Sequence, residues 1–294
     1  MSGTQSALLD PDFVRELEVL RRRLEIRARA GGAGEHSARR RGGSAEFQEH
    51  RPYAPGDDLR RIDWAAYART GEPVLKVFRS EEEVVARVVC DGSASMRFGE
   101  PPKIDVARRI SAAIGYLALA KSERAQLIVA GEGLTTHNLP QRGRSGLPGF
   151  LRQVDAIEAE GGTDLAKAID AVLRRSPRPG LLAVVSDFLD GGDVLAAMGR
   201  GAMAGHDLVL VHVVAHDELD PKFDGDFALE DAETGAIVEV TMDASALEAY
   251  ALRLMGLSEE LRAFAKKHRA CYVRVRTDEP LEPVVRRIVS REVD

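Results

Sequence analysis

The 294-residue chain has few cysteines, no excess of basic charge and no long apolar run. Its two cysteines, Cys90 and Cys271, each border an apolar stretch, which favours reduced core thiols over a disulfide framework. No segment approaches the ~18 consecutive apolar residues of a membrane-spanning helix, and the first residues lack the pattern of a signal peptide. The formal net charge of -6 argues against a general nucleic-acid binder. We therefore expect a soluble, cytoplasmic protein.

The chain also lacks the short motifs of the common enzyme classes. It contains no Gly-x-x-x-x-Gly-Lys-Ser/Thr loop, no Gly-x-Gly-x-x-Gly, no His-Glu-x-x-His and no Gly-x-Ser-x-Gly. Two histidines, His212 and His216, share one face of an apolar strand, but a separation of ~13 Å is too large for one metal ion. The sequence therefore predicts a protein that is not an enzyme.

The first 83 residues are expected to form an N-terminal accessory segment. Phe13, Leu17, Leu20 and Leu24 recur at helical spacing after Asp10, which is typical of an amphipathic helix. An arginine-bearing loop is expected over residues 31–47, followed by a Pro-Gly turn, a short capped helix and a strand over residues 73–83.

Residues 84–294 are expected to form one α/β domain. Strand-like apolar runs alternate there with helical patterns, which is typical of a mostly parallel sheet with helices on both faces. An antiparallel edge strand is expected after Gly131, and a hairpin over residues 227–240. The predicted strands are 84–90, 126–130, 181–186, 208–214 and 272–276, and the predicted helices are 103–120, 147–156, 164–174, 194–204, 244–268 and 281–289.

Polar residues lie at three places where loops are expected to leave the sheet: after strand 84–90, just before helix 164–174, and after strand 181–186. Functional groups of an open parallel sheet gather outside the carboxyl ends of its strands, so we expect these residues to converge. Their oxygen-only chemistry suits magnesium, calcium or manganese rather than zinc or copper. Neutral hydroxyl ligands would leave such a cation able to accept a carboxylate from a partner. The candidate ligands are Asp91, Ser93, Ser95, Thr163 and Asp187.

Each of these features has a simpler explanation when it is taken alone. Aspartate and serine are the residues that turns and helix caps prefer, so the Asp91 segment could be an ordinary polar loop. Thr163 could cap the helix that follows it, and Asp187 could be a cap or a loop residue. Their common position at the loop edge of one α/β pattern favours the metal site.

The same residues resemble a known site. The pattern Asp91-x-Ser93-x-Ser95, Thr163 and Asp187 resembles the metal-ion-dependent adhesion site (MIDAS) of von Willebrand factor A (vWA) domains over residues 84–294. The upstream stretch RPYAPGDDLRRIDWAAYARTGEPVLKVF resembles the signature of a bacterial group in that superfamily, domain of unknown function 58 (DUF58).

The resemblance implies a three-layer α/β/α fold, a divalent cation held by those five residues, and binding rather than catalysis. Members of the DUF58 group are commonly associated with MoxR-type AAA+ ATPases, which implies an adaptor in the remodelling or maturation of a client protein. The chain departs from the pattern at one position. Many vWA domains have glycine after the last metal aspartate, whereas this chain has Phe188.

Three further interpretations stay open from the sequence. A surface that mixes charge with an aromatic anchor is a candidate partner-binding site, although a turn and a capped helix would also explain it; its residues are Asp57, Asp58, Arg60, Arg61 and Trp64. The arginines Arg39 to Arg41 could contact nucleic acid or form a solvated loop. Asp91 could be the nucleophile of a magnesium-dependent phosphohydrolase, but Ser93 replaces the usual second aspartate.

Overall fold

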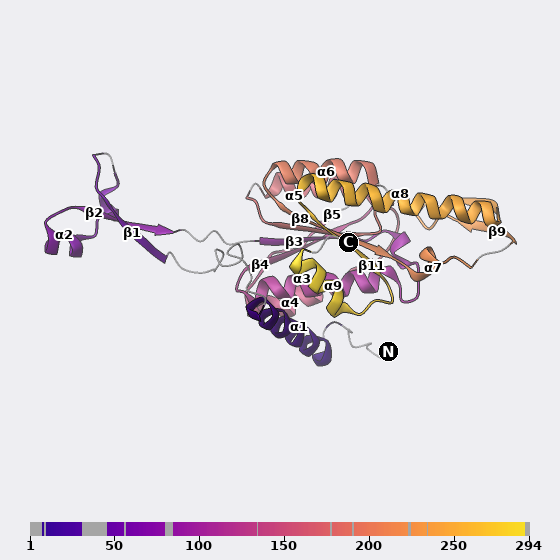
Figure 1. Ribbon diagram of the computed structural model, residues 1–294, viewed down its shortest axis with the longest axis horizontal. Helices are drawn as coiled ribbons and strands as arrows, with labels where there is room; N and C mark the ends of the chain where they lie inside the picture. The colour runs from indigo at the N-terminus through magenta and orange to yellow at the C-terminus, as the bar shows by residue number, and fades with distance from the viewer. Residues whose placement is uncertain are drawn as a thin grey trace. The chain divides into compact units, whose positions relative to one another are not determined.

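The protein folds into two compact units, and each makes most of its contacts within itself. The computed structural model (Figure 1) describes Leu8 and residues 10–30, 46–55, 57–79, 85–133, 135–176, 178–189, 191–222, 225–233 and 235–291. The larger unit comprises residues 1–32 and 84–294, and the smaller unit comprises residues 33–83. The arginines Arg39 to Arg41 lie outside the described residues.

A seven-stranded sheet forms the centre of the larger unit, in the order β11-β8-β7-β3-β4-β5, with β6 also paired to β4. Its strands are β3 (Val85–Asp91), β4 (Arg124–Ala130), β5 (Thr135–His137), β6 (Gln141–Arg142), β7 (Leu181–Ser186), β8 (Asp207–Val214) and β11 (Cys271–Arg276). Strands β3, β4, β7, β8 and β11 pair in parallel, whereas β5 and β6 run antiparallel to β4. The structure confirms the α/β class and the antiparallel edge after Gly131.

Helices cover both faces of this sheet and complete three layers (Figure 1). One hydrophobic core lies under α1 (Pro11–Ala30), α3 (Lys103–Ala120), α4 (Leu147–Asp155) and α9 (Leu281–Ser290). The other lies under α5 (Leu165–Arg175), α6 (Gly191–Met203) and α8 (Ala244–His268). Because both faces are covered, the central strands are apolar almost throughout rather than alternating. Within the described part of the chain, no helix is long and apolar enough to cross a membrane.

Helix α1 confirms the amphipathic helix expected near the N-terminus. Phe13, Leu17 and Leu20 are buried in the core that α3 and α9 share. The helix therefore packs with the larger unit, although the sequence analysis grouped it with the accessory segment 1–83.

The smaller unit consists of a two-stranded antiparallel sheet and two short helical segments. Strand β1 (Glu46–Pro52) pairs with β2 (Val74–Arg79). The turn η1 (Leu59–Arg61) and helix α2 (Trp64–Thr70) connect them. Strand β2 lies within the predicted strand 73–83, but β1 was not expected, because its polar sequence EFQEHRP lacks an apolar run.

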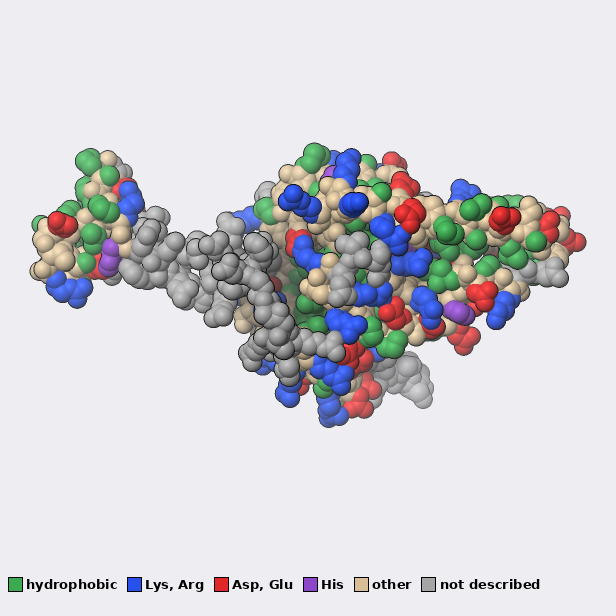
Figure 2. Space-filling view, viewed as in Figure 1, with side chains coloured by type: hydrophobic (Ala, Val, Ile, Leu, Met, Phe, Trp, Pro, Cys, Tyr) green, Lys and Arg blue, Asp and Glu red, His purple; other side chains and the backbone are tan. Residues whose placement is uncertain are grey.

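A β-hairpin and a short helix follow strand β8 in the larger unit. Helix α7 (His216–Leu219) comes first, and strands β9 (Gly225–Glu230) and β10 (Ile237–Met242) then confirm the predicted hairpin. Apolar side chains are exposed on this hairpin and on the N-terminal half of α8 (Figure 2), among them Leu229, Ile237, Val238, Leu252 and Met255.

Candidate metal centre

The loop after β3 is held in place by a glycine that lets two backbone segments approach closely. A Cβ atom on Gly92 would lie only 3.1 Å from the carbonyl oxygen of Ala130 and 3.3 Å from that of Glu158. The backbone N–H of Gly92 donates to the Ala130 carbonyl at 2.9 Å. Any larger residue would push the loop away from β4, so glycine at this position fixes where Asp91 and Ser93 lie.

Two backbone hydrogen bonds join this loop to the Thr163 loop. Ala94 N–H donates to the Gly161 carbonyl at 2.8 Å, and Glu160 N–H donates to the Gly92 carbonyl at 2.8 Å. Gly161 has φ 62, a left-handed conformation that favours glycine. Two segments about seventy residues apart in the chain are thereby brought together, as the sequence predicts.

Thr163 presents a buried polar atom without a partner. Its Oγ1 atom is buried and makes no hydrogen bond. Thr163, Asp91 and Asp187 line the same small cavity at the end of β3 and β7. A buried hydroxyl without a partner costs free energy, so its presence in this cavity requires an explanation.

Asp91 is buried and held by two donors. It is 1% exposed. Its Oδ1 accepts the N–H of Ser93 at 3.0 Å, and its Oδ2 accepts the hydroxyl of Ser186 at 2.5 Å. Burial raises the pKa of Asp91, and the nearby charge of Asp187 raises it further, while the Ser186 and Ser93 bonds oppose the change. Ser186 was missed in the sequence because serine inside an apolar strand gives no functional signal.

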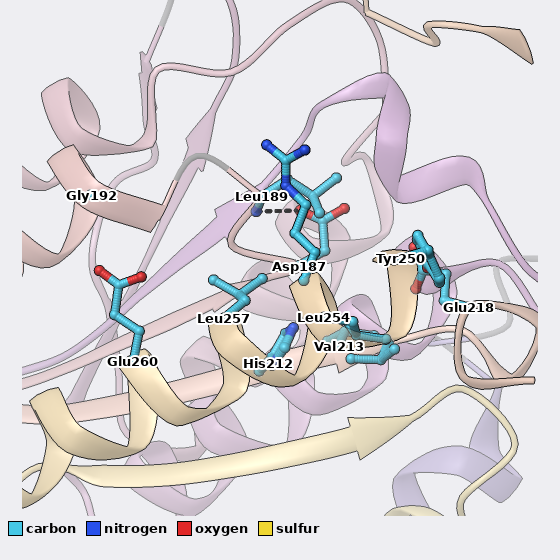
Figure 3. A pocket seen from close by; sticks show the side chains of 12 residues that line it. Asp187, Leu189, Gly192, His212, Val213, Glu218, Tyr250, Leu254, Leu257 and Glu260 are labelled. Atoms are coloured by element: carbon cyan, nitrogen blue, oxygen red, sulfur yellow. Dashed lines mark hydrogen bonds between the residues drawn. The ribbon is translucent and has the colours of Figure 1, made fainter. Parts of the chain in front are cut away.

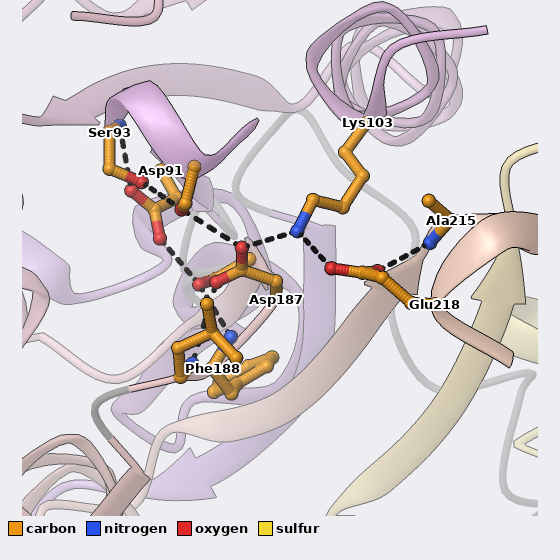
Figure 4. A network of polar contacts seen from close by, with 10 residues as sticks. Asp91, Ser93, Lys103, Asp187, Phe188, Ala215 and Glu218 are labelled. Atoms are coloured by element: carbon orange, nitrogen blue, oxygen red, sulfur yellow. Dashed lines mark hydrogen bonds and ion pairs between the residues drawn. The ribbon is translucent and has the colours of Figure 1, made fainter. Parts of the chain in front are cut away.

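The hydroxyls of Ser93 and Ser95 connect the first loop to Asp187. The two Oγ atoms lie 2.9 Å apart, and the Ser95 hydroxyl donates to Asp187 Oδ2 at 2.9 Å. Figure 4 shows Asp187 between the Asp91 and Ser93 side chains and Lys103. The structure thus brings the five predicted residues together at the carboxyl ends of the sheet. That they bind a cation stays a prediction.

A buried lysine contacts this cluster, and the sequence analysis did not identify it. Lys103 Nζ donates to Asp187 Oδ2 at 2.7 Å and to Glu218 Oε1 at 2.8 Å, and its side chain is 1% exposed. Burial lowers the pKa of Lys103, but the charges of Asp187 and Glu218 outweigh it, so the pKa is raised overall. Lys103 lies on the buried face of α3 with Ala107 and Ile110. A lysine at the helical spacing of these apolar residues is the sequence feature that could have identified it.

Phe188 occupies a backbone conformation that usually selects glycine. Its φ is 55, yet its side chain is only 1% exposed. The ring packs edge-on against His212, with ring centroids 6.0 Å apart. The ring therefore packs in the core, and Phe188 is also one of the residues that line the small cavity of Asp91 and Thr163.

A larger cavity begins beside Asp187, under helix α8. Its volume is about 290 Å³. Figure 3 shows Leu254, Leu257 and Glu260 projecting from α8, with Leu189 and Asp187 on the opposite side. His212 lies beneath it, and burial lowers the pKa of His212 to about 4, although Asp187 opposes the change. The cavity therefore places apolar side chains directly beside the oxygen cluster.

The residues predicted as a partner-binding surface divide into two groups in the smaller unit. Asp57 accepts the N–H of Ala54 and the guanidinium of Arg51, and Asp58 caps η1 by accepting the N–H of Arg60. These acidic residues hold the turn. Trp64, in contrast, is 62% exposed, and its ring meets the exposed ring of Tyr67 edge-on at 6.1 Å. The side chain of Arg61 lies outside the described residues.

Asp63, which was not among the predicted residues, links helix α2 to strand β1. It caps helix α2 by accepting the N–H groups of Ala65 and Ala66, and it contacts His50 Nε2 of β1 at 3.0 Å.

Comparison with known proteins places this chain in a family. The family described as "Protein of unknown function DUF58" matches residues 49–255. The chain belongs to the DUF58 family. The uncharacterized protein Rv1480 of Mycobacterium tuberculosis is 30% identical to this DUF58 protein over 290 residues, which cover 96% of this chain and 90% of that protein.

Solved structures resemble this DUF58 protein only distantly. BatB from Bacteroides thetaiotaomicron is 17% identical, covers 71% of this chain and 98% of its own, and has a TM-score of 0.45. The VWA domain of SpRpn10 is 10% identical, covers 69% of this chain and 94% of its own, and has a TM-score of 0.40.

Proposed function

We propose that this DUF58 protein is a non-enzymatic, divalent-cation-dependent protein-protein interaction module. The observation that carries the proposal is the buried hydroxyl of Thr163, which has no hydrogen-bond partner and lines a cavity together with Asp91 and Asp187. A cation in that cavity would give the hydroxyl oxygen the partner that it lacks.

The chemistry of the surrounding donors fits a hard cation. All of the donors are oxygens, which suit Mg²⁺, Ca²⁺ or Mn²⁺. Among the described residues, no group of three or more His, Cys, Asp and Glu side chains could hold a metal, so hydroxyl ligands are needed to complete this site. When bound, the cation would supply a positive centre that accepts a carboxylate from a partner. The residues that would hold it are Asp91, Ser93, Ser95, Thr163 and Asp187.

The hydrogen bonds of the cluster prepare these residues for binding. Ser186 and the Ser93 backbone fix both oxygens of Asp91. Groups that are already oriented lose little conformational entropy when a ligand binds.

The residues after Asp91 support binding over hydrolysis. A nucleophilic Asp91 would need a general acid close by, and Ser93 stands where phosphohydrolases of this kind have a second aspartate. The phosphohydrolase alternative therefore has less support.

We further propose that the protein works in the cytoplasm as an adaptor for a MoxR-type AAA+ ATPase, in the remodelling or maturation of a client protein. Membership of the DUF58 family supports this, since the group is commonly associated with such ATPases. The exposed pair Trp64 and Tyr67 supports a second contact surface on the smaller unit, because aromatic residues dominate many interfaces.

A pair of threonine variants tests the cation site. Thr163 and Thr277 both carry a buried hydroxyl without a hydrogen-bond partner, but only Thr163 lines the cavity of Asp91. We expect Thr163→Val to weaken Mg²⁺ binding about tenfold or more in calorimetric titration, because one ligand is removed. The matched Thr277→Val should bind Mg²⁺ as the native protein does, and both variants should keep the native melting temperature within a few degrees.

The same proteins, together with Ser93→Ala, test whether partner binding depends on the cation. Native protein and Thr277→Val should capture a purified MoxR-type ATPase in Mg²⁺ and release it in chelator, while Thr163→Val and Ser93→Ala should capture little in either. Equal capture by all four proteins in Mg²⁺ and in chelator would contradict a cation-dependent interaction.

A further inference from the structure

Lys103 places a positive charge inside the oxygen cluster. Its ammonium lies 2.7 Å from the same Asp187 oxygen that accepts the Ser95 hydroxyl. The lysine side chain is 1% exposed and that of Asp187 is 5% exposed. Water screens such a pair poorly, so much of the negative charge of Asp187 is already neutralised within the protein.

Glu218 shares this lysine with Asp187. Its Oε1 accepts from Lys103 at 2.8 Å, and its Oε2 accepts the backbone N–H of Ala215 at 2.7 Å. The second bond ties the carboxylate to the end of β8 and the start of α7. Glu218 therefore stays beside Lys103 and shares its positive charge. As a result, Lys103 neutralises Asp187 less than it would if Asp187 were its sole partner.

We propose that Lys103 is a positioning residue that withholds Asp187 from full participation in cation binding, so that a partner carboxylate is needed to complete the site. The inference rests on the proposed function. Of the two candidate carboxylate ligands, Asp91 is then the one without a lysine partner, and Glu233 also lines the cavity. A divalent ion held mainly by Asp91 and neutral hydroxyls keeps a net positive charge, and it binds more tightly when an external carboxylate arrives.

The charge relation predicts opposite effects for two substitutions. Lys103→Met removes the ammonium but keeps an unbranched side chain, so Asp187 recovers its charge and Mn²⁺ affinity should rise about tenfold or more. Glu218→Gln removes the second carboxylate, so Lys103 neutralises Asp187 more completely and Mn²⁺ affinity should fall severalfold. Asp217→Asn is the matched control, because it removes one negative charge from an exposed neighbour on the same helix.

The experiment measures free Mn²⁺ by electron paramagnetic resonance during titration of each full-length protein. Sodium acetate then serves as the probe for a partner carboxylate, with sodium chloride at equal ionic strength as its control. Acetate should raise the Mn²⁺ affinity of the native protein and of Asp217→Asn clearly more than that of Lys103→Met, because the lysine no longer withholds Asp187 in that variant.

The outcomes separate this inference from the proposed function. If the native protein does not bind Mn²⁺, the proposed function fails. If it binds Mn²⁺ and Thr163→Val weakens binding, but Lys103→Met and Glu218→Gln both match Asp217→Asn, the cation site stands and the role of Lys103 is wrong. If circular dichroism shows that Lys103→Met is unfolded, the test is the Mn²⁺ affinity of Glu218→Gln compared with that of Asp217→Asn. Equal affinities of these two variants would overturn the inference.

Discussion

Phe188 combines a left-handed backbone with a buried aromatic ring, and the two have opposite effects on stability. The left-handed conformation costs a residue with a Cβ atom roughly 1–2 kcal/mol, and glycine avoids that cost. The buried ring packs against His212 and contributes more than this. The strain is therefore tolerated next to Asp187 because the core that holds the ring determines the backbone there.

Two substitutions at this position test that balance. Phe188→Ala and Phe188→Gly should both lower the free energy of unfolding, by about 3–5 kcal/mol for alanine, because the ring is lost. The glycine variant should be about 1 kcal/mol more stable than the alanine variant, the reverse of the usual order, because only glycine relieves the left-handed strain. Urea denaturation measures the difference, and an alanine variant at least as stable as the glycine variant would contradict it.

At the scale of elements, helix α2 shows how a short segment depends on one side chain. Seven residues are too few for a stable isolated helix, so α2 needs its cap and its packing. Asp63 supplies two capping bonds and a contact to His50 of β1, and it is 7% exposed. Asp58 supplies one bond to the three-residue turn η1 and is exposed.

Alanine at these two aspartates should therefore have unequal effects. Asp63→Ala should destabilise α2 by about 1–2 kcal/mol, because two N–H groups and the contact to β1 lose their acceptor. Amide hydrogen exchange should show faster exchange over residues 64–70 in Asp63→Ala and native exchange there in Asp58→Ala. Similar exchange in the two variants would show that Asp63 is not what holds the helix.

At the scale of the whole molecule, the sheet order brings distant residues of the larger unit together. Strand β7 lies between β3 and β8, so the ends of these strands place Asp91, Asp187 and the Glu218 segment in one row. His212 of β8 is buried beneath that row and hydrogen-bonds through Nδ1 with the hydroxyl of Tyr272 at 3.1 Å. The stability of this central region is therefore coupled to the protonation of a histidine.

The free energy of unfolding should fall as the pH is lowered from about 6.5 to about 4. Burial lowers the pKa of His212 to about 4 from 6.5, so within this window the unfolded chain binds a proton that the folded chain does not. The loss attributable to His212 should approach about 3 kcal/mol. Urea unfolding across this range should show a clearly smaller pH dependence in His212→Gln, and a native dependence in the control His216→Gln, whose side chain is exposed. An unchanged dependence in His212→Gln would contradict the assignment.

Much of the larger unit could be predicted from local patterns. Apolar runs and helical spacing located β7, β8, α3 and α8 to within a few residues, because side-chain periodicity reports which faces are buried. Strand β1 was missed because a short, polar strand is stabilised by its partner β2 rather than by its own pattern.

The sequence by itself determined that Asp91, Ser93, Ser95 and Asp187 follow strands and that Thr163 precedes a helix, because the end of a strand and the start of a helix are local patterns. Only the tertiary structure decided that Lys103 enters this cluster and shares its charge between Asp187 and Glu218. Those contacts join α3, the end of β7 and α7, and they depend on the order of strands in the sheet. No local pattern encodes that order, because it is selected by the packing of the whole core.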